Sequence, residues 1–356
     1  MKIVILFVLF TIVLSSVSEV SGQEQQNQSR RDRFIQLLKM RQQAQGSGDQ
    51  TSAGQAPAGQ GRFAALRAAR QGSSAASSGD SSMLDPEEAA DARSTGNSNA
   101  TARDVPYGSD PLQQLDIYAP PKGSAPGPVI LFAHGGGWKR GDKKQHGPKG
   151  AAYSSRGVLF ISMNYRLAPN VVHPKQIQDI ASAFAWVKTH AKEYGGDPNR
   201  IYVMGHSAGA HLVDLLATND KYLEEKGLKL SDVKGCISLD TASLDLTQRA
   251  TLPGPASKMV ADMITTAFGT DPKVLTDASP LLQLHKGKAY PPFLMICSAN
   301  RRDSLAAHKQ FEKAVHEAGG TETTKVVPLN HGQISQAAGN PQTEVFADCL
   351  SFVEGK

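Results

Sequence analysis

Short apolar runs recur through the second part of the chain and predict buried β-strands. They cover residues 129–133, 158–163, 201–204, 235–239, 293–297 and 325–329. Apolar runs of this length with little alternation are typical of strands covered on both faces of a parallel sheet. The pattern therefore predicts a mainly parallel sheet and not a sandwich with one wet face.

Helical patterns lie between several of these runs. In residues 177–194 the apolar positions fall on one stripe with a 3.6-residue period. A second pattern covers residues 207–217, and a third covers 305–318 and ends at Gly319, which suits a helix C-terminus. Strands that alternate with helices imply right-handed crossovers. The sequence predicts one α/β domain over residues 104–356, with helices on both faces of the sheet.

The first 22 residues have the pattern of a signal peptide. Lys2 precedes an apolar stretch, Ile3–Leu14, that is too short to span a bilayer as a helix, and small and polar residues follow as far as Gly22. We expect residues 1–22 to direct the protein to a secreted or periplasmic location. An uncleaved N-terminal anchor is the alternative.

Residues 23–103 are rich in Gln, Ser, Gly, Ala and Arg and have few aromatic or β-branched residues. Such a composition buries too little apolar surface to offset the loss of chain entropy on folding. We expect a disordered spacer. Its two short basic apolar segments, 33–40 and 62–67, favour transient helices, because isolated helices of this length are marginal in water.

Charge and cysteine content narrow the possible partners. The net charge is +5, and basic residues are interspersed with acidic ones, so we expect no nucleic-acid partner. Cys236, Cys297 and Cys349 lie inside apolar runs, which predicts buried thiols and not a disulfide framework. Their spacing does not suggest a metal site, and no dinucleotide or P-loop motif is present, so we expect no metal and no cofactor. We also expect no obligate membrane partner.

The segment Gly205–Gly209 carries the strongest chemical signal. It reads Gly-His-Ser-Ala-Gly, follows the apolar run at 201–204 and opens the helical pattern at 207–217. A nucleophile on a sharp turn between a strand and a helix needs small neighbours, because side chains there would clash with the backbone. Ser207 is therefore the predicted nucleophile, with helix N–H groups close to it.

A run of three glycines, Gly135–Gly137, follows the apolar run that ends at Ala133. Consecutive glycines let backbone N–H groups approach a substrate carbonyl closely, as in an oxyanion hole. The tract lies at the expected distance before a G-x-S-x-G turn, which favours this role over a simple Gly-rich loop.

Together these motifs give the chain a family resemblance. From Tyr107 to Val353 it resembles the α/β-hydrolase esterases of the hormone-sensitive-lipase-like and carboxylesterase group, including the feruloyl and acetyl esterases of polysaccharides and the related kynurenine formamidases. Residues 115–120, 164–169 and 196–201 carry this resemblance beside the two glycine motifs. The resemblance implies an α/β-hydrolase fold with a small lid and an oxyanion hole formed by Gly136, Gly137 and the Ala208 backbone.

The serine needs a base that a third group orients, and in this fold the order along the chain is Ser, acid, His. His331 comes just after the last apolar run and is the predicted base. His206 within the turn and His211 one helical turn further cannot face the Ser207 hydroxyl from the opposite side.

The acid is predicted to be Asp303, in the turn after the run at 293–297, where the resemblance commonly puts it. The commonest spacing in such enzymes falls nearer to Asn300, which cannot stabilise an imidazolium by charge. Asp240 and Asp245, after the preceding run, are the next candidates.

These residues predict a carboxylesterase-type serine hydrolase that acts through an acyl-enzyme on a small or polysaccharide-linked ester of the acetyl or feruloyl type. An arylformamidase-like amide hydrolase and a catalytically silent binding module of the same fold are the alternatives. Residues 244–277 are expected to form a small lid or pocket wall, and the sequence gives no oligomeric state.

Overall fold

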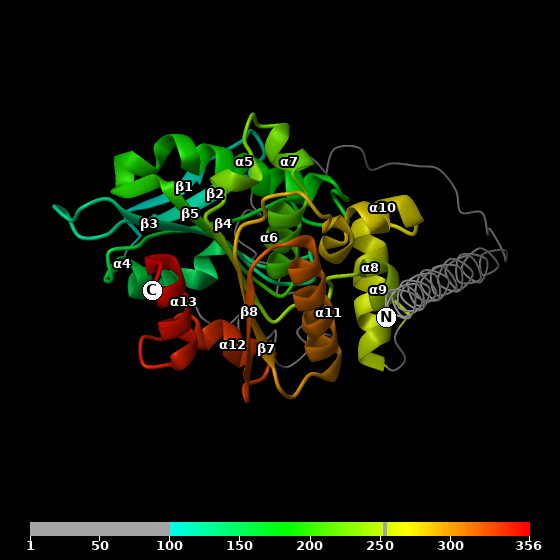
Figure 1. Ribbon diagram of the computed structural model, residues 1–356. Helices are drawn as coiled ribbons and strands as arrows, with labels where there is room; N and C mark the ends of the chain where they lie inside the picture. The colour runs from blue at the N-terminus through cyan, green and yellow to red at the C-terminus, as the bar shows by residue number, and fades with distance from the viewer. Residues whose placement is uncertain (1–99, 252–254) are drawn as a thin grey trace, which may run out of the picture.

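The computed structural model describes residues 100–251 and 255–356 (Figure 1). The predicted signal peptide at 1–22 and most of the predicted spacer at 23–103 lie outside these residues. The first described strand, β1 (Ala102–Pro106), begins two residues before the predicted start of the domain at residue 104.

The described strands form one eight-stranded sheet in the order β1-β2-β4-β3-β5-β6-β7-β8. After β1 they are β2 (Gln114–Tyr118), β3 (Gly127–Ala133), β4 (Leu159–Met163), β5 (Gly196–His206), β6 (Gly235–Leu239), β7 (Phe293–Ser298) and β8 (Glu322–Val327). The β1–β2 and β2–β4 pairs are antiparallel, and all other pairs are parallel. The mainly parallel sheet predicted from the apolar runs is confirmed.

Helices connect and cover these strands. They are α4 (Gly147–Ser154), α5 (Lys175–His190), α6 (Ala208–Thr218), α7 (Lys221–Glu224), α8 (Leu246–Arg249), α9 (Pro255–Phe268), α10 (Pro272–Asp277), α11 (Arg302–Ala318), α12 (His331–Ala337) and α13 (Glu344–Glu354). The three predicted helices correspond to α5, α6 and α11. Helix α11 ends at Gly319 in the left-handed conformation, as its sequence predicts.

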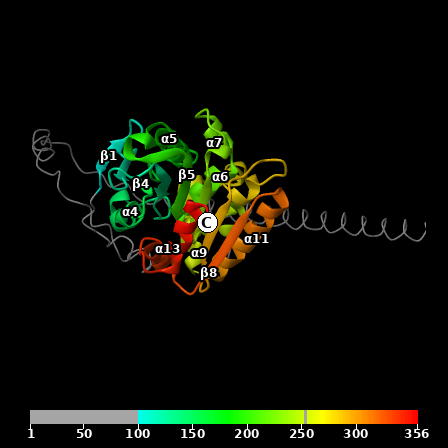
Figure 2. The same cartoon turned by 60° about the vertical axis from the view of Figure 1, so that its left-hand side comes forward.

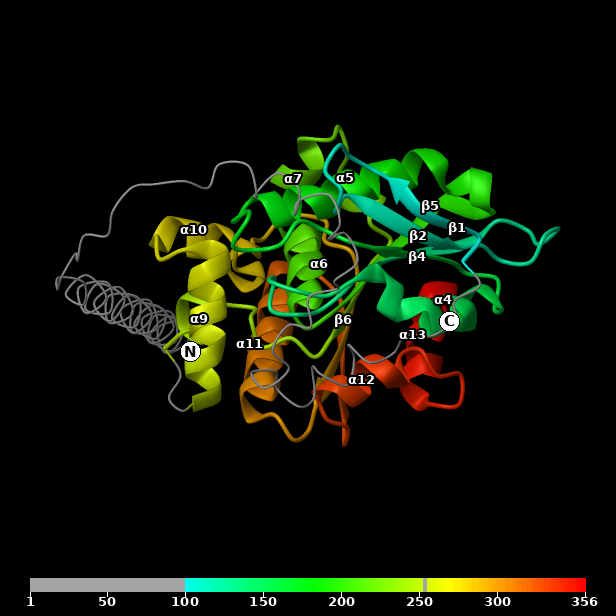
Figure 3. The same ribbon diagram turned by 180° about the vertical axis from the view of Figure 1, so that it is seen from behind.

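The two faces of the sheet carry separate hydrophobic cores. Along β3, Val129 and Leu131 pack into the core under α5, α6 and α11, whereas Ile130 and Phe132 pack into the core under α4, α12 and α13. This alternation follows from the two-residue period of a strand. Figures 1, 2 and 3 all show the C-terminal helix α13 beside α4, although the two are far apart in sequence.

The parallel strands end at one common edge, and this edge positions the site. The chain segments after β3, β5, β6 and β8 all leave the sheet there, so residues close behind these strand ends come together. Cys236, Cys297 and Cys349 are free and buried, as predicted. In residues 100–251 and 255–356, no helix is long and apolar enough to cross a membrane.

Candidate active site

Ser207 lies at the turn between β5 and α6. Its φ of 54° and ψ of −117° are unusual for a residue with a side chain. A Cβ atom at Gly205 would lie 2.4 Å from the Gly209 backbone, and one at Gly209 would lie 2.2 Å from the Ala133 carbonyl oxygen. Both glycines are therefore required by close backbone packing, and the Ser207 side chain faces the cavity described below.

The glycine loop after β3 lies against this turn. Gly137, Trp138 and Ala208 line the same cavity as Ser207. In the described chain the N–H groups of Gly137 and Ala208 donate no hydrogen bond to other backbone groups, so they can bind a developing oxyanion. Gly136 also shapes the loop, because its φ is +111° and its carbonyl accepts hydrogen bonds from the Lys139 and Arg140 N–H groups. Its own N–H likewise donates to no other backbone group in the described chain, so Gly136 stays a predicted oxyanion donor.

Trp138 is held in place by a buried histidine of α6. The Trp138 Nε1–H donates to His211 Nδ1 at 3.3 Å, and His211 Nε2–H donates to the Ala278 carbonyl at 2.8 Å. Burial lowers the pKa of His211 to about 3, so this histidine stays neutral and can accept the indole proton. His211 thus fixes the oxyanion loop and does not face Ser207.

His331 lies at the start of α12, and the Asn330 side chain caps this helix by accepting from the Gln333 N–H. The His331 ring lines the cavity with Ser207, and its Nδ1 lies 2.7 Å from Asp240 Oδ2. His206 is the last residue of β5, and its Nε2–H donates to the His331 carbonyl oxygen at 3.0 Å. The two histidine rings are tilted, with centroids 4.4 Å apart.

Asp240 follows β6 directly and has a φ of 52°. Besides His331, it accepts hydrogen bonds from the Ser298 N–H at 3.1 Å, the Ser304 hydroxyl at 2.7 Å and Arg301 Nη1 at 2.7 Å. Burial alone would raise the pKa of Asp240, but the hydrogen bond from His331, the charge of Arg301 and the Ser304 hydroxyl outweigh it and hold this pKa well below its usual range. Asp240 is therefore an anion fixed behind the imidazole.

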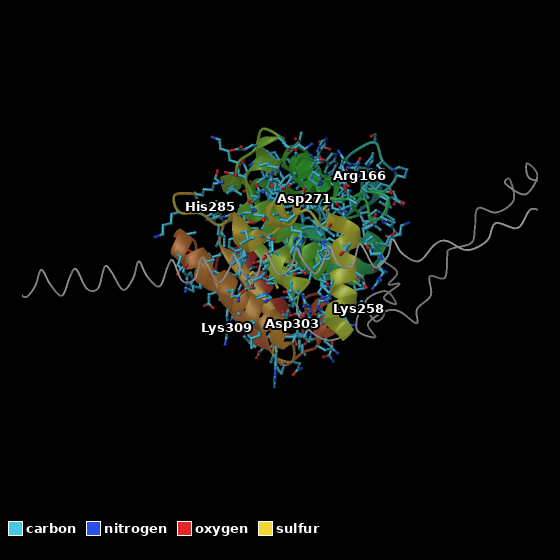
Figure 4. All side chains as sticks on the ribbon, turned by 90° about the vertical axis from the view of Figure 1, so that its right-hand side faces the viewer. Arg166, Lys258, Asp271, His285, Asp303 and Lys309 are labelled. Atoms are coloured by element: carbon cyan, nitrogen blue, oxygen red, sulfur yellow. The ribbon has the colours of Figure 1, made fainter. Side chains whose placement is uncertain are left out.

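Asp303 does not contact His331, and its prediction as the acid is wrong. It lies in the first turn of α11, where Figure 4 labels it, and accepts a hydrogen bond from Arg249 Nη2 at 2.6 Å. Arg301 Nη2 is 3.9 Å away. The reason is positional, because Asp303 is already inside the helix, while the turn after β7 directs Arg301 toward the imidazole. Asp240, the reserve candidate, occupies the place behind His331.

Two groups, Arg301 and Asp240, compete for the Nδ1 atom of His331. Arg301 Nη1 lies 2.7 Å from both His331 Nδ1 and Asp240 Oδ2. A guanidinium donates only, so it could bond Nδ1 only in the tautomer that leaves Nε2 protonated. A base for Ser207 needs the other tautomer, in which Nδ1–H donates to Asp240. The carboxylate of Asp240 thus selects the tautomer that can accept the Ser207 proton.

The cavity has an empty volume of about 550 Å³, which includes space open to solvent. It is lined by Gly137, Trp138, Ser207, Ala208, Asp240, Thr241, Ala242, Ser243, Arg249, Met259, Val260, Met263, Arg301 and His331. Met259, Val260 and Met263 belong to α9, so the predicted wall within residues 244–277 is confirmed. In the described residues, no cluster of three or more His, Cys, Asp or Glu side chains could hold a metal ion.

Residues 115–316 match the model of the BD-FAE family. The chain belongs to the BD-FAE family. The chain is 31% identical over 237 residues to the esterase LipC of Mycobacterium tuberculosis. This match covers 63% of this chain and 56% of LipC. The chain also matches plant proteins described as probable isoprenylcysteine α-carbonyl methylesterases. In one of them, from Arabidopsis thaliana, the match covers only 23% of that protein. The chain thus spans about half or less of the length of these curated relatives.

Solved structures share the fold of this BD-FAE family member. Esterase B from Lactobacillus rhamnosis superposes with a TM-score of 0.64 at 24% identity, over 75% of this chain and 90% of that chain. An acetyl ester-xyloside bifunctional hydrolase from Caldicellulosiruptor lactoaceticus superposes with a TM-score of 0.58 at 21% identity, over 73% and 98%. These likenesses and the sheet topology establish the α/β-hydrolase fold.

Proposed function

We propose that the protein is a serine carboxylic-ester hydrolase that acts through an acyl-enzyme. One arrangement carries this proposal: Ser207 on a strained turn shares a cavity with His331, which is bonded to the buried anion Asp240. Membership of the BD-FAE family and the similarity to LipC, which is described as an esterase, support the same activity.

In the proposed reaction, Ser207 Oγ attacks the ester carbonyl carbon and passes its proton to His331 Nε2. Asp240 stabilises the imidazolium that forms, and the N–H groups of Gly137 and Ala208 stabilise the oxyanion. Collapse of this intermediate breaks the ester C–O bond, and His331 gives the proton to the leaving alcohol. Water then attacks the acyl-enzyme carbonyl while His331 takes its proton. Collapse of the second intermediate breaks the bond to Ser207 Oγ, His331 returns the proton to this oxygen, and the acid is released.

The cavity favours a short acyl group of the acetyl type. A Cβ atom added at Gly137 would lie only 2.6 Å from Met263 Sδ, so α9 packs directly on the oxyanion loop. Trp138 and Met259 add bulk to the same wall. A small acyl group leaves room for the alcohol part of a small or polysaccharide-linked ester to reach solvent. The signal-like segment at residues 1–22 supports a secreted or periplasmic location, where such esters are found.

Hydrolysis of p-nitrophenyl esters with acyl chains of two to eight carbons tests this proposal. We expect the full-length protein to hydrolyse the acetate fastest, and Ser207→Ala to lower kcat by about 10⁶. A folded wild-type protein that hydrolyses none of these esters would contradict the proposal. Acetylated and feruloylated xylan, supplied as matched polymers, then decide between the two acyl types.

A further inference from the structure

Arg249 is a buried cation in the wall of the same cavity that contains Ser207 and His331. Arg249 is the last residue of α8, and only 5% of its surface is exposed to solvent. It has no role in the reaction proposed above, although it lines the cavity. Burying a guanidinium is costly unless its donors are paired. Its pairing therefore indicates what the cavity is built to bind.

The Arg249 side chain is only partly paired. It has five N–H donors, and its Nη2 donates to Asp303 Oδ2 at 2.6 Å. Its Nε and Nη1 are buried and have no hydrogen-bond partner in the described residues. Burial lowers the pKa of Arg249 while the charge of Asp303 raises it, so the guanidinium is short of anionic partners.

The nearby carboxylates do not fill this need. Asp240 already accepts from His331, Arg301, Ser304 and the Ser298 N–H. The Asp303 side chain is 31% exposed and also lies within 3.9 Å of Arg301. Arg301 also lines this cavity, so two guanidinium groups belong to the lining of the cavity that contains Ser207.

We propose that the preferred ester substrate carries a carboxylate that binds Arg249. This inference rests on the proposed esterase function and adds its substrate class. A carboxylate matches the planar donors of a guanidinium better than a hydroxyl or an amide does, and it supplies the charge that the buried cation lacks. The carboxylate can belong to the acyl part, as in a monoester of a dicarboxylic acid, or to the alcohol part, as in an acylated acidic sugar.

Matched substrate pairs test the proposal and separate the two sources. For the acyl part, 4-nitrophenyl hemisuccinate is compared with 4-nitrophenyl succinamate, its neutral amide. For the alcohol part, 4-carboxyphenyl acetate is compared with 4-carbamoylphenyl acetate. The full-length protein is used, and the rates of Ser207→Ala are subtracted. We expect kcat/KM to favour the carboxylate over the amide in one pair by about ten- to a hundredfold, the range of one hydrogen bond to a charged group.

Two variants assign that preference to Arg249. Arg249→Gln should bring the carboxylate-to-amide ratio close to one. Arg302→Gln is the matched control, because it removes the same charge from an exposed neighbour of Arg301 and should keep the preference. Asp303→Asn removes the carboxylate that pairs with Arg249 and should raise the carboxylate-to-amide ratio, whereas Arg249→Gln should lower it. Asp303→Asn keeps the test decisive if Arg249→Gln does not fold.

The outcomes separate this inference from the proposed function. If neutral esters are hydrolysed in a Ser207-dependent way but neither pair shows a preference, the carboxylate proposal is overturned and the esterase stands. If Arg249→Gln and Asp303→Asn change both members of each pair equally, Arg249 only fixes α8 to α11, and the proposal is again overturned. If no ester is hydrolysed, both proposals fail together.

Discussion

At the residue scale, two aspartates near the imidazole differ in what surrounds them. Asp240 is buried at the end of β6 and receives four hydrogen bonds, one of them from His331. Asp303 lies in the first turn of α11, is partly exposed, and pairs with Arg249. Since an imidazolium is stabilised by a carboxylate in direct contact, only Asp240 can orient His331 as a base.

Replacing these aspartates by asparagine should separate their roles. We expect Asp240→Asn to lower kcat by about 10³–10⁴, because an amide supports the wrong His331 tautomer. Asp303→Asn should cost far less on a neutral ester such as p-nitrophenyl acetate. Steady-state kinetics of the two variants, with circular dichroism to confirm folding, make the comparison. A larger loss for Asp303→Asn would restore that residue as the acid.

At the element scale, a buried carboxyl joins α6 to the central strands. Asp214 of α6 accepts hydrogen bonds from the Ser238 hydroxyl at 2.8 Å and from the Cys236 thiol at 3.4 Å, both on β6. Burial raises the pKa of Asp214 to about 7, and the two hydrogen bonds only partly oppose it. Helix α6 also begins at the Ser207 turn, so this contact helps to hold the nucleophile against β6.

This pKa makes stability depend on pH in a definite direction. Between about pH 4 and pH 7 the folded protein keeps the Asp214 proton and the unfolded chain releases it, so stability falls as the pH rises. The loss is at most roughly 4 kcal/mol and is complete above pH 7. Asp214→Asn can still accept from Ser238 and lacks this titration.

Urea unfolding at pH 4.5 and pH 7.5 measures the effect. The free energy of unfolding of Asp214→Asn, relative to wild type, should increase between these two pH values. Taking the difference removes the contributions of other groups, such as His211, whose lowered pKa acts in the opposite direction. A difference that does not change with pH would contradict the raised pKa of Asp214.

At the scale of the whole molecule, the C-terminal helix completes the second core. Phe346 of α13 is 2% exposed, and its ring lies 4.7 Å from the Tyr153 ring of α4. Val345, Cys349 and Val353 bury the same face of α13. Because this helix packs on β3 and β7, it helps to hold the strands that lead into the glycine loop and into the turn that carries Arg301.

Phe346→Ala should lower the free energy of unfolding by about 3–5 kcal/mol, the usual cost of a large aromatic cavity. The matched control is Phe352→Ala on the same helix, where the side chain is only partly buried and the loss should be clearly smaller. Guanidinium unfolding followed by circular dichroism gives both values. Equal losses would show that the buried face of α13 does not carry the stability.

Much of the fold follows from local sequence pattern. The apolar runs identify β3 to β7 and the 3.6-residue period identifies α5, because each depends on which residues must leave water. The run at 325–329 locates β8, but its prediction as a strand buried on both faces is wrong, because β8 lies at the sheet edge and Val326 is 49% exposed. Helix α12 was not predicted, because its seven residues are too few to show a clear 3.6-residue period of apolar positions. Strand β1 was not predicted either, because it lies at the sheet edge with its side chains largely exposed and so has no apolar run.

The sequence by itself determined the α/β class, the positions of Ser207 and His331 at strand ends, and the glycines that let two loops approach each other. These depend on chemistry within a few residues. Only the tertiary structure decided that Asp240 and not Asp303 contacts His331, and that Arg249 and Arg301 reach the same cavity. Those contacts join β6, α8, α11 and α12, and their geometry depends on how far each side chain extends from its element, which no local pattern contains.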